Sequence, residues 1–117
     1  MDNLQDSLDI RVGALFNSKI KKQLIDKSQS IYSSVEPQKS NDVFVNLQNK
    51  LEAIKQTIIM LSDELIKIGN EALNDFEEEI QTVPTIEKNK AVENLKELIT
   101  EEIKEIVKQM STSKFGD

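Results

Sequence analysis

The stretch that decides the fold runs from Phe44 to Ala72, FVNLQNKLEAIKQTIIMLSDELIKIGNEA. Apolar residues recur in it at alternating steps of three and four, without a miss. These residues are Phe44, Leu47, Leu51, Ile54, Ile58, Leu61, Leu65, Ile68 and Ala72. Because an α-helix turns once every 3.6 residues, this spacing places them along one side of a helix, as in a coiled coil. The stretch therefore predicts a long helix with an apolar seam that other helices cover.

A second apolar row accompanies this seam in the later half of the helix only. It comprises Ile59, Ile66, Leu73 and Ile80, with Phe76 close to it. A straight helix drifts by about 20° per heptad against a seven-residue repeat, but drift alone does not explain why Ile59 follows Ile58. The doubled row predicts that the later half of the helix contacts two neighbours and the earlier half one.

Two prolines, Pro37 and Pro84, divide the chain into three helical stretches. We predict helices over about residues 4–35, 41–81 and 85–111, of which the second is the longest. Short turns make successive helices antiparallel. The third helix should therefore lie beside the later half of the second.

The predicted fold class is all-α: an antiparallel helical hairpin extended by a third helix into an elongated three-helix bundle with coiled-coil-like packing. The 117 residues predict a single helical domain over residues 1–112, followed by a flexible tail at 113–117. Hydrophobic residues make up 38% of the chain and charged residues 31%, which favours an elongated bundle over a sphere.

The composition argues against catalysis. The chain has no histidine and no cysteine, so it lacks the commonest general base, the thiol nucleophile and the usual zinc ligands. Its densest acidic cluster, Asp75 with residues 77–79, lies on consecutive helical positions that point about 100° apart and do not converge on one cation. We therefore expect no enzymatic activity, no cofactor and no metal site.

The charge is −6 overall and uneven, being 0 over residues 1–36, −5 over 37–84 and −1 over 85–117. Nucleic acid is a poor candidate partner because phosphate binding requires a sustained basic surface. The one basic cluster is Lys19, Lys21, Lys22 and Lys27. We interpret this cluster as a solvated helix face, with an anionic membrane surface or phosphate as the alternative.

The sequence also bears on localisation. Met1 is followed by Asp2, Asp6 and Asp9 rather than by a basic region and an apolar run, which predicts no cleaved signal peptide. The longest apolar run, residues 58–61, is far too short to span a membrane. We expect a cytoplasmic protein, with any export, alone or together with a partner, using a route that reads no cleaved leader.

The order of features resembles the small helical proteins of the WXG and LXG type, which serve type VII secretion in Gram-positive bacteria. The likeness covers roughly residues 8–80: an opening Asp9-Ile10-Arg11-Val12, a turn that contains serine and proline, a phenylalanine near the start of the second helix in Phe44-Val45-Asn46-Leu47-Gln48, and an acidic segment at Leu73-Asn74-Asp75-Phe76-Glu77. It is closest to the accessory proteins encoded beside LXG-type toxins. The resemblance implies binding to the toxin's N-terminal helical region, as a targeting factor or chaperone. Tyr32 and Glu36 fit the family's aromatic-x-x-x-acid export signal, although they lie at the first turn.

The leading hypothesis is thus a non-enzymatic partner protein that packs against helices of a larger secreted toxin or a second accessory protein. The residues expected to bind the partner are Ile59, Ile66, Leu73, Phe76 and Ile80. The alternative is a self-associating coiled-coil protein, structural or regulatory, of a phage or bacterial cytoplasm. In that case copies of the same seam would meet each other.

Overall fold

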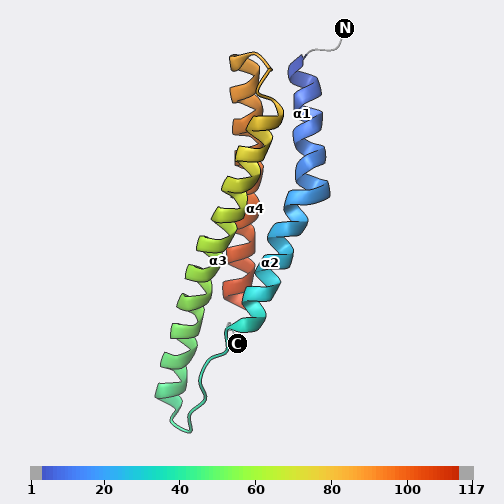
Figure 1. The fold of residues 1–117 in the computed structure, drawn as a ribbon. Helices are drawn as coiled ribbons and strands as arrows, with labels where there is room; N and C mark the ends of the chain where they lie inside the picture. Colours follow the sequence, from blue (N-terminus) through green and yellow to red (C-terminus); the bar gives the residue numbers. More distant parts are fainter. Residues whose placement is uncertain (1–3, 114–117) are drawn as a thin grey trace.

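The computed structural model describes residues 4–113, and these are helical except for two connections. The elements are α1 (Leu4–Leu15), the π-helical turn η1 (Phe16–Ile20), α2 (Lys21–Ser34), α3 (Val43–Glu79) and α4 (Thr85–Ser113). The molecule measures 68 × 21 × 19 Å, and no strand occurs among the described residues (Figure 1). The predicted all-α, elongated three-helix bundle is confirmed.

The helix bounds differ from the expected ones by at most two residues at either end. The second helix begins at Val43 because Asp42 caps it: the Asp42 carboxylate accepts hydrogen bonds from the backbone N–H groups of Phe44 and Val45 at 2.9 and 3.1 Å. Residues 1–3, which the expectation about a signal peptide includes, lie outside the described part of the chain. So does the predicted tail, apart from Ser113, which ends α4.

The first helical stretch runs without a break through α1, η1 and α2, as Figure 1 shows. Six of its buried residues recur every four positions, namely Leu8, Val12, Phe16, Ile20, Leu24 and Ser28, and Ile31 follows three positions later. In a regular α-helix such a row drifts by about 40° per step around the axis. The wider turn of η1, in which the Lys21 N–H bonds to the Phe16 carbonyl, takes up part of that drift. The row can therefore stay on the side that faces the other helices.

Helix α3 runs antiparallel to the first stretch, and α4 returns beside the later half of α3 (Figure 1). Of the first stretch, α1 packs mainly on α4, whereas α2 packs on both α3 and α4. The later half of α3 therefore lies beside two neighbours, although Ile59 and Ile66 of the row that led to this prediction are exposed. Helix α4 packs closely on α3 at Gly69, where an added Cβ would lie 2.9 Å from Ile99 Cγ2.

Helix α3 enters the core with the middle and later part of the predicted seam, but its fully buried row is inclined to that seam. The buried residues of α3 are mostly four positions apart: Ala53, Thr57, Leu61, Leu65, Gly69 and Phe76, followed by Ile80 directly after the helix end. Rows at this spacing incline to the helix axis, so that neighbouring helices cross over them. Of the predicted seam, Leu61 and Leu65 are buried and Ile68 and Ala72 pack against the same core. Its first members, Phe44, Leu47 and Leu51, are exposed.

Two of the residues expected to bind a partner require correction. Phe76 and Ile80 are 0% and 1% exposed and belong to the main core, together with residues of α1 and α4. They are buried because α1 and α4 flank the end of α3, a closure that a single helix pattern does not reveal. Neither side chain is available to another protein in this fold.

Gly13, in α1, offers a test of helix propensity without packing. Apart from the adjoining residues and the backbone of its own helix, no heavy atom lies within 4 Å of the position that a Cβ would take there. We expect Gly13→Ala to raise the free energy of unfolding by about 0.5–1 kcal/mol, because alanine loses less backbone entropy in a helix than glycine does. Urea denaturation followed by circular dichroism measures the change. A loss of stability would mean that this part of α1 is not helical or is more tightly packed.

Candidate interaction surface

The first three turns of α3 expose large apolar side chains on one face. Phe44, Leu47 and Leu51 are 66%, 53% and 57% exposed, and Val43 is exposed beside them. These four residues are called the exposed seam below. Figure 1 shows why they are uncovered: the beginning of α3 extends past the ends of α2 and α4. The seam continues into Ile54 and Ile58, which are half-buried where the other helices begin to cover it.

The connection from α2 to α3 does not cover the exposed seam either. It follows another side of α3, where Asn49 Nδ2 donates to the Gln38 carbonyl at 3.0 Å and Asn46 Oδ1 accepts from the Ser40 N–H at 2.6 Å. Asn49 lies two positions from Leu51 and so points to nearly the opposite side of the helix. The loop thus forms hydrogen bonds with the polar side of these turns and leaves their apolar side exposed to solvent.

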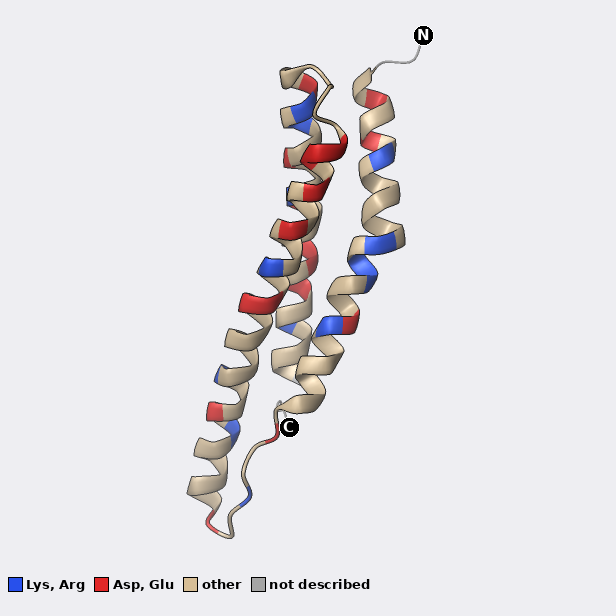
Figure 2. Cartoon of the chain, in the orientation of Figure 1, with Lys and Arg blue, Asp and Glu red and all other residues tan. Residues whose placement is uncertain are grey.

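Charge is distributed unevenly along α3, as Figure 2 shows. Acidic side chains gather in its later half, whereas residues 43–58 carry only Lys50, Glu52 and Lys55. An amphipathic helix that lies on the exposed seam would therefore meet a largely apolar surface with few charges.

A smaller exposed row lies further along α3. Ile59 and Ile66 are 50% and 51% exposed, and Leu73 is half-buried. Ile59 and Ile66, called the outer row below, are thus the members of the predicted partner-binding set that are half exposed. Sequence reasoning missed the exposed seam as a site. The length of the second helix, predicted at 41 residues beside helices of 32 and 27, did indicate that its neighbours cannot cover all of it. The doubled apolar row nevertheless directed the prediction to the later half of the helix.

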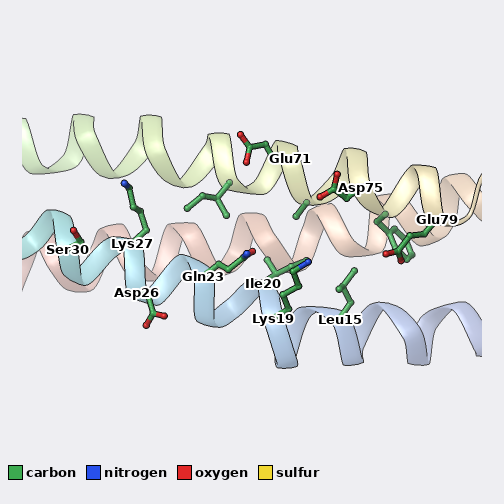
Figure 3. Close-up of a pocket in the computed structure, with 13 residues that line it drawn as sticks. Leu15, Lys19, Ile20, Gln23, Asp26, Lys27, Ser30, Glu71, Asp75 and Glu79 are labelled. Atoms are coloured by element: carbon green, nitrogen blue, oxygen red, sulfur yellow. The ribbon is translucent and has the colours of Figure 1, made fainter.

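A groove separates the first helical stretch from α3 (Figure 3). Its volume is about 510 Å³, within the range of small-ligand pockets of roughly 300–1,000 Å³. Its apolar lining comes from Leu15, Ile20, Ile68, Ala72 and Phe76. Its charged lining comes from Lys19, Asp26 and Lys27 on one side and from Glu71, Asp75 and Glu79 on the other.

Two ion pairs join the helices that flank this groove. The Arg11 guanidinium lies 3.0 Å from the Glu79 carboxylate, and Lys27 Nζ lies 3.8 Å from the Glu64 carboxylate. Figure 3 shows Lys27 reaching toward α3 while Asp26 points away. Both pairs are about half exposed, so each stabilises the fold by at most about 1 kcal/mol. They nevertheless span the gap, and a helix about 10 Å wide would have to displace them to enter. The groove suits single side chains, and the exposed seam suits a helix.

The residues of the predicted export signal lie at the end of α2. Tyr32 is half-buried within α2, whereas Glu36 is exposed beyond the helix end at Ser34. Val35, between them, has an extended backbone, so Tyr32 and Glu36 do not share a helical face. Both make interactions within the chain.

Among residues 4–113, ligand-type side chains do not gather in any group of three or more that could hold a metal ion. None of the described helices combines the length and apolarity that crossing a membrane requires. Compared with protein-family models, with curated proteins and with solved structures, the chain finds no match.

Proposed function

We propose that this chain is a non-enzymatic partner protein that binds a helix of another protein along the exposed seam. The observation that carries the proposal is the exposure of Val43, Phe44, Leu47 and Leu51 within nine residues of one helix. Fully covering one such side chain stabilises a complex by roughly 1.5–3 kcal/mol. Contiguous exposed apolar patches on a small protein are typical of interaction sites.

The resemblance to LXG-associated accessory proteins supports a specific partner. In this proposal the exposed seam holds the N-terminal helical region of a larger secreted toxin, and the chain acts as its targeting factor or chaperone in the cytoplasm. Phe44, which opens the second helix in that resemblance, is among the most exposed apolar residues of the chain. Export together with the toxin would then involve Tyr32 and Glu36 as the signal.

The seam can be tested by placing a charge within it. We expect Leu47→Asp to weaken binding at least tenfold, because the complex would bury an unpaired carboxylate. The measurement is co-expression with the product of the adjacent gene, followed by size-exclusion chromatography and titration calorimetry. Ile66→Asp, assayed alongside, shows whether the outer row belongs to the same interface.

Ile10→Asp is the matched control for this test. Ile10 is also a strongly exposed apolar residue, but it stands on α1, far from the exposed seam along the bundle. We expect its change to leave binding unaltered. Equal binding by the wild type and Leu47→Asp, with both folded by circular dichroism, would exclude the exposed seam as the interface. A wild-type chain that is monomeric, stable and indifferent to the adjacent-gene product would reject that product as the partner.

A further inference from the structure

The charges beside the exposed seam specify what kind of helix fits on it. In a pair of packed helices, the positions on either side of the apolar seam face the partner and determine its choice. Between residues 43 and 62 these positions hold Val43, Gln48, Lys50, Lys55 and Ser62, besides Thr57, which is buried within the chain itself. Lysine is the only charged residue among them. Glu52 lies toward the back of the helix, next to Leu51 but about 100° around from it.

A second copy of the chain is a poor occupant for this reason. If two copies packed in parallel and in register, Lys50 of each would face Lys55 of the other. Antiparallel pairing within this stretch also brings lysines together, because no carboxylate stands beside the seam. The next flanking position along α3 is Glu64, whose carboxylate already pairs with Lys27 of its own chain at 3.8 Å. Like charges in such positions destabilise a helix pair.

We infer that the exposed seam takes a helix of a different protein, one with glutamate or aspartate on both sides of its own apolar row. The inference rests on the proposed function and adds the chemistry of the partner. Such a helix would bring carboxylates to Lys55 and toward Lys50, which also interacts within its own chain. Residues 43–58, which hold the exposed seam and its half-buried continuation, span about 24 Å. A partner helix of three heptads would cover them completely.

Two synthetic 21-residue helical peptides test this inference. Both carry leucine and isoleucine at the seam positions, and they differ only in having glutamate or lysine at every flanking position. We expect the glutamate peptide to bind the full chain at least tenfold more tightly than the lysine peptide in about 50 mM salt. The difference should shrink in 0.5 M salt, where charges are screened beyond about 4 Å. Fluorescence anisotropy of labelled peptides gives both dissociation constants.

Charge reversal on the chain provides the matched variant. In Lys55→Glu, and more strongly in Lys50→Glu/Lys55→Glu, the preference should move toward the lysine peptide. A peptide with aspartate at the seam positions and glutamate beside them should not bind. This control separates recognition of the seam from general attraction between charges. Circular dichroism confirms that each variant keeps its helices.

The other possible results separate the acidic partner from the proposed function, which is binding of a helix along the exposed seam. Equal binding of the two peptides, or preference for lysine, overturns the acidic partner while leaving the exposed seam as an interface. Binding of neither peptide overturns both. A wild-type dimer in light scattering that Leu47→Asp dissociates also overturns the inference, because the seam would then be occupied by a second copy.

Discussion

Replacing Phe76 with alanine should lower the free energy of unfolding by about 3–5 kcal/mol. Phe76 is fully buried in the main core, so the substitution removes a large apolar side chain and leaves a cavity. A domain of this size has only about 5–15 kcal/mol of stability in total. The variant should therefore unfold at a much lower urea concentration, as followed by circular dichroism at 222 nm.

Ile66→Ala is the control for Phe76→Ala, because both residues belong to the partner-binding set predicted from the sequence. Ile66 is half exposed and lies outside the core cluster. Its replacement should change stability by no more than about 0.5 kcal/mol, since alanine also has the higher helix propensity. Similar losses in the two variants would contradict the assignment of Phe76 to the core and of Ile66 to the surface.

The helices could be predicted because their signals are local. The alternating apolar spacing of residues 44–72 is incompatible with a strand, and Pro37 and Pro84 mark the two connections. Helix length and antiparallel order then follow from the short connections. The π-helical turn η1 could not be predicted, because it adjusts the buried row of the first stretch to the neighbours that the row meets.

Part of the buried face of α3 was not predicted because it consists of small residues. Ala53, Thr57 and Gly69 lie in the core row, yet none stands out in a pattern of large apolar residues. The Thr57 hydroxyl is fully buried and donates to the Ala53 carbonyl at 2.8 Å, so even its polarity is satisfied within the helix. Small residues let helices approach closely. Ile59, further around the helix, is left exposed, whereas Leu47 is exposed because it lies beyond the ends of α2 and α4.

Only part of the candidate site could be predicted from the sequence. Ile59 and Ile66 stand out as a surplus row, and they are exposed. The exposed seam, in contrast, carries the same spacing as a core seam. Only the ends of α2 and α4 decide that Leu47 and Leu51 lack neighbours. That is a property of how three helices overlap, and no single helix encodes it.

Gly69→Val should lower the free energy of unfolding by about 1–3 kcal/mol, the usual cost of overpacking a core. A Cβ at Gly69 would lie 2.9 Å from Ile99 Cγ2, closer than van der Waals contact allows. That methyl is fixed directly to the Ile99 Cβ, so it cannot move aside as the end of a long side chain would. The gain in helix propensity over glycine is below about 1 kcal/mol and does not offset the clash. Urea denaturation measures the loss.

Two further variants decide whether close packing of α3 on α4 is the cause. Gly13→Val makes the same change where nothing lies within 4 Å, and it should leave stability within about 0.5 kcal/mol of the wild type. In an Ile99→Ala background the clashing methyl is absent, so Gly69→Val should cost less than it does in the wild type. Residues in contact show such coupling, whereas independent residues do not. Equal losses of stability in both backgrounds would mean that α4 does not pack on Gly69 through Ile99. Helix α4 would then be aligned with α3 in a different register, and the part of α3 that it leaves exposed would change.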